Sequence, residues 1–474
     1  MANKNRIVEK LFTIVLRQKQ VRQFSVKKID DYIYDKMVKN YSGNHSPEVQ
    51  LARYYYISAA LNSVNNNLNN GNISYEFIKR IKPLLIGDDF LHNGDNFKTY
   101  RQGHFDYKSK YGLNPPGFVA ISPTQKCNLQ CVGCYASSNN ETTQTLPYNY
   151  VTKIIDDVYN NFCRRFIVIS GGEPFMYKSE NKTIMDVFEK YPDVFFLVFT
   201  NGTLINADIA EKMSRFGNVT VAISVEGYEY ETDARRGIGV YKKIKKSIGY
   251  LQSYGVPFGI SVTATSKNID LLLNEDFYDF YFNEIGATYM WQFQMMPIGK
   301  AGETLDLVVP PKQRIELYKF WTKLVKNKKY PIADFWNNAI ISNGCLAYGS
   351  EGGYIYVDWN GNIMPCVFVP YYVDNIYDIY GRNLSLADAV MSEFMKNGRQ
   401  WQNINKGINY HMPCSIRDHY SNFKQNILTK ECKPENREAA EALTDDEYYD
   451  FMICYDTELA MLTDINLNDN LKYD

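Results

Sequence analysis

The chain has 474 residues, a formal net charge of −1 and 22% charged residues. This length allows two to three domains, and a hydrophobic content of 45% excludes wholesale disorder. The balanced charge argues against a general nucleic-acid binder, so we expect no nucleic-acid partner.

The sequence shows no clear signal for secretion or for a membrane span. The first 28 residues carry eight Lys and Arg, but the apolar run between them is short and broken by charge. No segment approaches the roughly 18 apolar residues of a transmembrane helix. We therefore expect a cytoplasmic protein, in which clustered cysteines serve metal binding or catalysis rather than disulfides.

Residues 1–115 are predicted to be helical. One amphipathic, basic helix is predicted at 5–18, with a stripe formed by Ile7, Val8, Leu11, Phe12 and Val15. Such a helix packs on the rest of the protein, binds a peptide, or lies on a membrane surface as a peripheral contact. A second helix is predicted from residue 48, ending in an Asn- and Gly-rich turn at 65–72. Pro115 and Pro116 then mark a boundary, because proline cannot continue a helix.

Six apolar runs rich in β-branched and aromatic residues follow. They lie at 118–122, 166–170, 194–200, 219–225, 258–264 and 289–296, with segments of helix length between them. Apolar strands that alternate with helices are typical of a parallel sheet covered on both sides. The pattern predicts an α/β fold, a partial (β/α)6 TIM-like barrel, with its active site at the carboxyl ends of the strands.

The pattern changes again after about residue 335. Residues 344–366 are rich in glycine and predict a β-hairpin that turns at Asn360-Gly361. Residues 431–474 are acidic, with thirteen Asp and Glu against three Lys and Arg. We therefore expect three parts, which are a helical N-terminal region at 1–115, the barrel at 116–335, and a small hairpin and helix domain at 336–474.

Three of the nine cysteines stand within eight residues. Cys127, Cys131 and Cys134 form a C-x3-C-x2-C pattern directly after the first predicted strand. Thiolates are ligands for zinc and for iron–sulfur clusters. A structural zinc site is the weaker alternative, because it usually has four ligands and no further Cys or His follows before Cys163. Three thiolates on a short loop leave one metal corner open, where a substrate or cofactor can bind.

The spacing, the preceding strand and the aromatic Tyr135 resemble the radical S-adenosylmethionine (SAM) enzyme family, over roughly residues 117–300. The resemblance implies a [4Fe–4S] cluster on Cys127, Cys131 and Cys134, whose fourth iron binds SAM. In the family, one electron cleaves SAM to methionine and a 5′-deoxyadenosyl radical, which abstracts hydrogen from the substrate.

Later segments match further motifs of this family. Gly171, Gly172, Glu173 and Pro174 match its GGEP motif, which implies contact with the amino group of SAM. Two glycines let a backbone approach a ligand closely, and a glutamate can pair with an ammonium. The resemblance also implies that strand ends surround the methionine and ribose, that an arginine pairs with the carboxylate, and that the sixth strand ends near adenine. The residues at these places are Thr200, Asn201, Ser224, Glu226, Arg236 and Met296.

A second group of cysteines follows the barrel. Cys345 and Cys366 bracket the predicted hairpin in a C-x15-G-x4-C arrangement, which resembles the SPASM/twitch extension of the family. That extension holds auxiliary [4Fe–4S] clusters through a dense run of cysteines, which is reduced here to Cys414, with Arg417 at the position of the second cysteine. One auxiliary [4Fe–4S] cluster is therefore implied, and its expected ligands are Cys345, Cys366, Cys414 and Cys432.

Some alternatives remain open for these residues. The second group could be ordinary buried thiols, and without Cys432 its cluster would keep an iron open to substrate. We expect Cys163 to be a buried core thiol, and Cys454 to be a core thiol, a ligand or a hydrogen donor. Arg417, Asp418 and His419 are expected in a solvated loop rather than at the active site.

The resemblance leaves the substrate open. Many relatives with SPASM-like extensions modify a peptide or protein side chain, often with a winged-helix module for a leader peptide, which the helical residues 1–115 match poorly. A small molecule or lipid is the alternative, to which the basic helix and the 39 Tyr and 26 Phe would be suited. An iron–sulfur electron carrier or sensor without SAM turnover is a third class, against which the complete GGEP motif argues. The enzyme would also need a reducing partner such as flavodoxin or ferredoxin.

Overall fold

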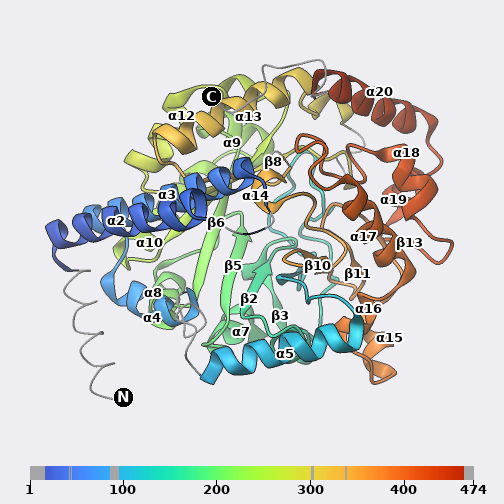
Figure 1. Ribbon diagram of the computed structural model, residues 1–474, viewed down its shortest axis with the longest axis horizontal. Coiled ribbons are helices and arrows are strands. Elements are labelled where there is room, and N and C mark those ends of the chain that lie inside the picture. The colour runs from blue at the N-terminus through green and yellow to red at the C-terminus, as the bar shows by residue number, and fades with distance from the viewer. Residues whose placement is uncertain are drawn as a thin grey trace.

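A nine-stranded sheet forms the centre of the computed structural model, which describes residues 17–41, 43, 45–85, 95–299, 304–336 and 339–463 (Figure 1). The strand order is β11-β10-β1-β2-β5-β6-β7-β8-β9, and all neighbours are parallel except β10 and β11. The strands are β1 (Phe118–Ile121), β2 (Phe166–Ile169), β5 (Phe195–Thr200), β6 (Val219–Val225), β7 (Phe258–Ala264), β8 (Tyr289–Gln294), β9 (Ile332–Asp334), β10 (Tyr354–Val357) and β11 (Ile363–Met364).

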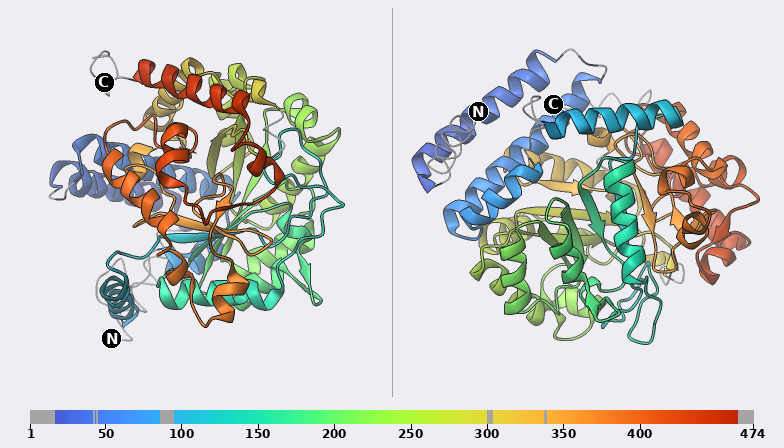
Figure 2. Two further views of the ribbon diagram at one scale, coloured as in Figure 1. Left: turned by 90° about the vertical axis from the view of Figure 1, so that its right-hand side faces the viewer. Right: turned by 90° about the horizontal axis from the view of Figure 1, so that it is seen from below.

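All six predicted strands form, and the partial barrel is confirmed. Their β-branched and aromatic side chains are suited to a pleated surface that is buried on both faces. Helices between successive strands cover the outer face (Figure 2). They are α6 (Tyr148–Asn161), α7 (Ile184–Lys190), α8 (Ala207–Phe216), α9 (Glu229–Arg236), α10 (Val240–Ser253), α11 (Ile269–Leu272), α12 (Glu275–Asp279) with the π-helix η3 (Phe280–Glu284), and α13 (Pro311–Asn327). The inner face instead lines a cavity, so alternate strand residues such as Trp291 and Phe293 point into it.

The predicted hairpin is also confirmed, and it joins the same sheet. Asp358 accepts hydrogen bonds of 2.8 Å from the backbone N–H groups of both Asn360 and Asn362, and Gly361 takes the left-handed conformation that the turn needs (φ 81°). β10 then lies parallel to β1, with Tyr354 opposite Phe118. The sheet therefore runs across the expected boundary at 335, and the division into three parts stays a prediction.

The described part of the N-terminal region consists of helices. They are α2 (Lys19–Tyr34), the π-helix η1 (Asp35–Lys39), α3 (Pro47–Asn70), α4 (Tyr75–Leu85) and α5 (Asp95–Tyr111). The predicted stripe from Ile7 to Val15 lies outside the described residues. The turn expected from residue 65 is wrong in its start, since α3 continues to Asn70 and ends at Gly71. Tertiary contacts explain this, because Asn65 is buried and accepts a 3.0 Å hydrogen bond from Arg22 Nε.

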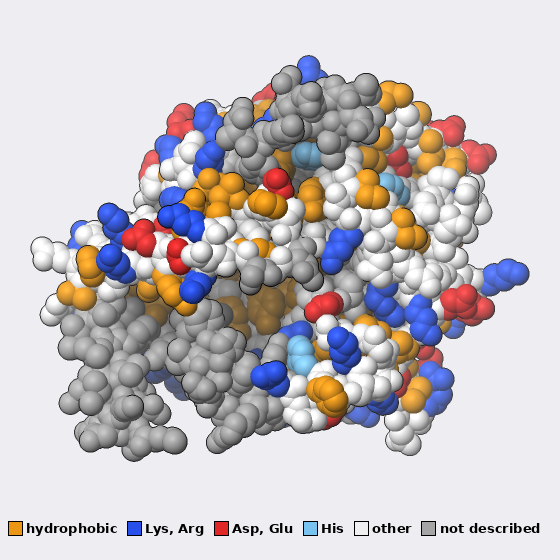
Figure 3. All heavy atoms as spheres, viewed as in Figure 1, with side chains coloured by type: hydrophobic (Ala, Val, Ile, Leu, Met, Phe, Trp, Pro, Cys, Tyr) orange, Lys and Arg blue, Asp and Glu red, His pale blue; other side chains and the backbone are white. Residues whose placement is uncertain are grey.

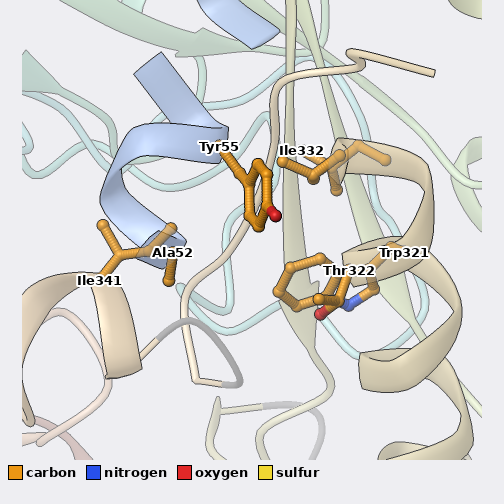
Figure 4. A pocket seen from close by; sticks show the side chains of 7 residues that line it. Ala52, Tyr55, Trp321, Thr322, Ile332 and Ile341 are labelled. Carbon is orange, nitrogen blue, oxygen red and sulfur yellow. The ribbon is translucent and has the colours of Figure 1, made fainter. Parts of the chain in front are cut away.

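The long helix α3 packs against the outside of the barrel. A small cavity of about 20 Å³ lies between α3, β9, α13 and α14 (Ala339–Ser342) (Figure 4). Tyr55 points from α3 toward Trp321 and Thr322 of α13, while Ala52 lies near Ile341. The N-terminal helices are thus held to the β8–α13–β9 side of the barrel.

Most of the remaining chain packs beside β10 and β11, and its last helix packs against α13 (Figure 1). It contains α15 (Ile376–Gly381), α16 (Leu386–Ala389), α17 (Glu393–Asn405), α18 (Tyr420–Asn422), the π-helix η6 (Phe423–Ile427), α19 (Arg437–Glu441), α20 (Asp446–Thr463) and the ladder of β12 (Tyr371–Tyr372) with β13 (Lys433–Pro434). On the face shown in Figure 3, charges of both signs are interspersed with apolar side chains. None of the described helices combines the length and apolar character needed to cross a bilayer.

Candidate active site

A cavity of about 290 Å³ occupies the inside of the barrel. It brings together most of the site residues predicted from the sequence. Those that line it are Cys127, Cys131, Cys134, Tyr135, Gly171, Gly172, Thr200, Asn201, Ser224, Arg236 and Met296. Glu173, Pro174 and Glu226 are not among the lining residues and lie behind the wall.

The loop with the first three cysteines is fixed on two sides. Asn201, at the end of β5, donates from Nδ2 to Asn128 Oδ1 at 2.9 Å, and the same nitrogen is 3.8 Å from Cys127 Sγ. On the other side, the backbone N–H of Val132 donates to the carbonyl of Arg235 at 3.0 Å, and Arg235 Nε donates back to the Val132 carbonyl at 3.1 Å. The loop therefore keeps its shape through contacts with β5 and α9.

The glycines of the GGEP motif are needed for contact with this loop. The backbone N–H of Gly172 donates to the carbonyl of Thr124 at 2.9 Å, and that of Glu173 donates to the carbonyl of Lys126 at 2.8 Å. A Cβ at Gly172 would collide with the carbonyls of Gln125 and Lys126. Tyr135 adds a link, since its hydroxyl is 2.9 Å from Ser170 Oγ. These glycines were expected to let the backbone approach a ligand. In the structure they also let the backbone of the GGEP motif approach the backbone that leads into the cysteine loop.

Glu173 is fully buried, and its carboxylate is occupied by the protein. Oε1 accepts from Thr200 Oγ1 at 2.7 Å, and Oε2 accepts from the backbone N–H of Asn201 at 2.8 Å. Burial raises the pKa of Glu173 to about 7, against the effect of these hydrogen bonds. Glu173 therefore ties the GGEP motif to the end of β5, and its role toward an ammonium stays a prediction.

Glu226 is buried between two arginines of α9. Its carboxylate forms ion pairs with Arg235 at 2.7 Å and with Arg236 at 2.5 Å. Both arginines line the cavity, so one negative charge is shared by two positive charges. This end of the cavity therefore has an excess of positive charge, which favours a thiolate or a carboxylate ligand.

The loop cysteines lie in an environment that disfavours free thiolates. Burial raises the pKa of Cys127 to about 12. Burial also raises the pKa of Cys131, although Arg236 and Arg235 act in the opposite direction. A bound metal would replace the thiol protons and offset the cost of burying the thiolates.

Sequence reasoning missed several polar residues of the cavity. Ser261, Thr263 and Gln294 line it from β7 and β8, and Ser138 lines it from beyond the cysteine loop. Ser138 Oγ is buried and has no hydrogen-bond partner within the described part of the chain. The signal for the strand residues is present in the sequence, because they are polar residues at alternate positions of otherwise apolar strands.

The rest of the wall is aromatic. Rings come from β1, β2, β5, β8 and β10, and from the segments after β9 and β11. The rings are those of Phe118, Phe166, Phe199, Trp291, Phe293, Phe335, Tyr354 and Phe368. A cavity of this composition favours an uncharged, apolar group next to the polar cysteine end.

The structure brings three of the later cysteines together. Burial raises the pKa of Cys414, and the negative charge of Asp418 and the neighbouring thiols of Cys345 and Cys366 raise it further. The sulfur atoms also accept hydrogen bonds, with 3.4 Å from the backbone N–H of Ala347 to Cys345 and 3.4 Å from that of Phe368 to Cys366. Three close thiols with N–H donors fit the ligand set of an iron–sulfur cluster.

Cys432 is not brought to this group. Its thiol accepts from the backbone N–H of Thr429 at 3.5 Å, and Tyr371 of β12 is its neighbour. The expected burial of Cys163 in the core is wrong, since this thiol is only half-buried and packs against Gly103 of α5. Cys454 is exposed, which excludes the core-thiol alternative for that residue.

The expectation of a solvated loop at 417–419 is also wrong. Arg417 and Asp418 are buried, because Asp418 forms an ion pair of 2.7 Å with the equally buried Arg314 of α13. Asp418 Oδ2 also accepts from the backbone N–H of Cys414 at 3.0 Å. Arg417 donates to the carbonyl of Met295, next to the cavity residue Met296. These residues hold the Cys414 loop against the end of β8.

Comparisons with known proteins agree with this geometry. The sequence profile described as Radical SAM superfamily matches residues 121–277. The chain therefore contains a radical SAM domain. The region matched contains the cysteine loop, the GGEP motif and the ends of β5 and β6.

Radical SAM relatives of two kinds are similar to the chain. An AdoMet-dependent heme synthase of Methanosarcina barkeri is 26% identical over 56% of this chain and 80% of its own. The mycofactocin maturase MftC of Mycobacterium ulcerans is 26% identical over 61% of this chain and 76% of its own. Among solved structures, SuiB of Streptococcus suis bound to SAM has a TM-score of 0.54 at 15% identity, over 83% of this chain and 95% of its own, which concerns the fold.

The radical SAM domain makes the chain an enzyme whose cofactors are SAM and a [4Fe–4S] cluster, and its maturase-type relatives indicate an auxiliary [4Fe–4S] cluster. Within the described ranges, no group of three or more His, Cys, Asp or Glu is arranged to hold a single metal ion. A [4Fe–4S] cluster instead takes its thiolates on separate irons. The two cysteine groups, the cationic α9 end and the unpartnered Ser138 hydroxyl fit these cofactors.

Proposed function

We propose that this radical SAM enzyme modifies a side chain of a peptide or protein substrate. The observation that carries the proposal is the second cysteine group, Cys345, Cys366 and Cys414, assembled beside the barrel cavity. A SPASM/twitch-like auxiliary centre is a feature of many peptide-modifying relatives, and the relative MftC is named a maturase.

We assign the cofactors to the two groups on their geometry. Cys127, Cys131 and Cys134 would hold the cluster that binds SAM, and Cys345, Cys366 and Cys414 would hold the auxiliary cluster. When bound, the first cluster and SAM supply a 5′-deoxyadenosyl radical for hydrogen abstraction. Leaving Cys432 out gives the auxiliary cluster three cysteine ligands, so that one iron stays open to another ligand.

The protein's own contribution is to orient and to exclude water. Arg236 would face the SAM carboxylate while Glu226 holds its guanidinium in place. Tyr135, Thr200, Asn201, Ser224 and Met296 would surround the rest of SAM, as in the family's strand-end sites. Ser138 offers a further hydroxyl. The aromatic wall keeps the space beyond dry, which protects a reactive radical from side reactions.

The size of the cavity supports a side chain as the reacting group. About 290 Å³ lies at the lower end of the range of ligand sites, and SAM would take part of it. An apolar or aromatic side chain reaching in from a peptide needs little space and matches the rings of the wall. We infer that the reacting residue is uncharged.

A small-molecule substrate is the second candidate. It is favoured by the similarity to a relative named as a heme synthase, which covers most of that relative. The two candidates differ in what must enter the barrel, since a large planar molecule would require the aromatic wall to open.

The division of the chain is part of the proposal. We assign residues 1–115 to substrate or partner binding, 116–335 to the radical SAM core and 336–474 to the auxiliary cluster domain. The described part of residues 1–115 forms the helices α2 to α5 and no strand, which differs from the strand-rich wing of a winged-helix module.

Turnover of a peptide tests the proposal. The anaerobically reconstituted, reduced enzyme should form 5′-deoxyadenosine, and a precursor peptide encoded beside its gene should change in mass. The matched control is the same enzyme with a scrambled peptide. If only a tetrapyrrole or another small molecule is changed, the second candidate holds. If a fully loaded enzyme forms no 5′-deoxyadenosine, SAM cleavage at the three-cysteine loop is contradicted.

A further inference from the structure

The outer side of the cysteine loop is exposed and apolar. Val132 lies between Cys131 and Cys134, and its side chain is 50% exposed although both cysteines line the cavity. The loop is joined at Val132 to the end of α9 by one backbone hydrogen bond to Arg235 and one hydrogen bond donated by the Arg235 side chain. Three residues later, Ile238 is 100% exposed. Two apolar side chains thus stand in solvent directly outside the loop.

The corner that carries Ile238 is held firmly. Asp233 accepts hydrogen bonds from the backbone N–H of Gly239 at 2.6 Å and from that of Tyr241 at 2.8 Å. The N–H of Gly237 donates to the Asp233 carbonyl at 2.8 Å. The glycines on both sides of Ile238 have φ of 113° and 80°, values that favour glycine. Ile238 is therefore presented to solvent by a built turn.

A strip of lysines begins at the same corner. α10 buries one stripe that includes Val240, Ile244 and Ile248, and its opposite face carries only positive charge. The exposed residues of that face are Lys242, Lys243, Lys245 and Lys246. Among the residues described by the structure, no carboxylate lies within ion-pair distance of any of these four side chains. The helix contains no acidic residue.

These lysines oppose the helix dipole. The amino end of a helix favours negative side chains, and the neighbouring helices follow this rule with Asp208 in α8 and Glu229 and Glu231 in α9. In α10 the first turns are cationic instead. The Asp233 carboxylate satisfies the backbone N–H groups at this amino end, and an external anionic partner would pair with the lysines themselves.

We propose that Val132, Ile238 and the four lysines of α10 form the docking surface for an acidic, one-electron donor protein. The inference rests on the proposed placement of the SAM-binding cluster on Cys127, Cys131 and Cys134. A donor seated on this surface stands against the loop that would hold the cluster. The small apolar centre with a charged rim matches transient electron-transfer interfaces, in which charge speeds association.

The test compares electron donors. In one variant the four lysines become glutamate (K242E, K243E, K245E, K246E), and the matched control makes the same charge change on four exposed lysines of α7 and α13 (K190E, K312E, K319E, K323E). Formation of 5′-deoxyadenosine is measured with limiting reduced flavodoxin, with dithionite and with reduced methyl viologen. The two small donors have opposite charges and need no docking surface.

We expect the α10 variant to lose about tenfold or more of its rate with flavodoxin. Its rates with both small donors should stay within about twofold of the wild type, and the control should keep the flavodoxin rate. The wild-type flavodoxin rate should fall with added salt, because exposed charges are screened. I238S should lower the rate with flavodoxin and leave the rates with dithionite and methyl viologen unchanged.

Other outcomes overturn the proposal. Equal losses with all donors would show that the lysines serve the site or the substrate, such as an acidic peptide. An unchanged flavodoxin rate in the α10 variant would place the docking surface elsewhere. Absence of 5′-deoxyadenosine with every donor in the wild type would instead contradict the proposed function.

Discussion

The two cysteine groups differ in how the chain assembles them. Cys127, Cys131 and Cys134 come from one loop, whereas Cys345, Cys366 and Cys414 come from separate segments that meet only in the folded protein. Positive charge from α9 faces the first group, and the carboxylate of Asp418 lies next to the second. The first loop also reaches the surface through Val132. The first group is thus local in sequence, whereas the second depends on the tertiary fold.

Removing the first group has the largest expected effect. The triple change of Cys127, Cys131 and Cys134 to Ala should abolish 5′-deoxyadenosine formation, since no thiolate would remain to hold the cluster. Iron content should fall from about eight to about four per chain. Iron analysis and product chromatography measure both effects. Unchanged iron would mean that this loop holds no cluster.

The second group allows a sharper comparison of single residues. Cys414→Ala should remove most of the auxiliary cluster's absorbance, whereas Cys432→Ala should leave iron content within about one tenth of the wild type, since its thiol stays with Thr429. SAM cleavage should survive in both variants. A loss of iron in Cys432→Ala equal to that in Cys414→Ala would contradict the three-cysteine set.

Breaking the buried ion pair between Arg314 and Asp418 should have the next largest effect. Arg314→Met leaves Asp418 buried without its partner, which should cost about 3–5 kcal/mol of the free energy of unfolding. The control is Lys212→Met, which breaks the exposed pair with Asp208 and should cost about 0.5 kcal/mol or less. Thermal or denaturant unfolding measures the difference, and equal small costs would show that the buried pair contributes little.

The smallest effect depends on pH. Asp456 in α20 accepts from the backbone N–H of Tyr420 at 2.8 Å, and burial raises its pKa from 3.8 to about 8. Because its pKa is raised in the folded state, protonated Asp456 contributes fully to the stability of the folded protein below about pH 4. This contribution is lost as the pH rises to about 8. Asp456→Asn should therefore become more stable relative to the wild type as the pH rises from 5 to 8. Unfolding at both pH values measures this gain, and a constant difference would contradict the raised pKa.

Local patterns were sufficient for the strands, the hairpin and the cysteine loop, because each depends on residues close in sequence. The position of Glu173 behind the cavity wall was not predictable, since its partners Thr200 and Asn201 lie at the end of another strand. Burial of Asp418 depends on Arg314 and was missed for the same reason. Asn65 followed a turn-like composition but lies in a helix, because Arg22 holds its side chain. Polar residues whose partners are distant are the ones that sequence patterns describe least well.

The pairing of β10 with β1 has a consequence for timing within the catalytic cycle. Their backbone register joins Phe118 to Tyr354 and Ile121 to Val357, so one hydrogen-bonded unit leads into the first cysteine loop and lies between Cys345 and Cys366. The separation of the two cysteine groups is then set by strand geometry, and it cannot vary as it would between hinged domains. Electron exchange between centres held on such a unit would proceed at a constant rate, with no domain movement to wait for.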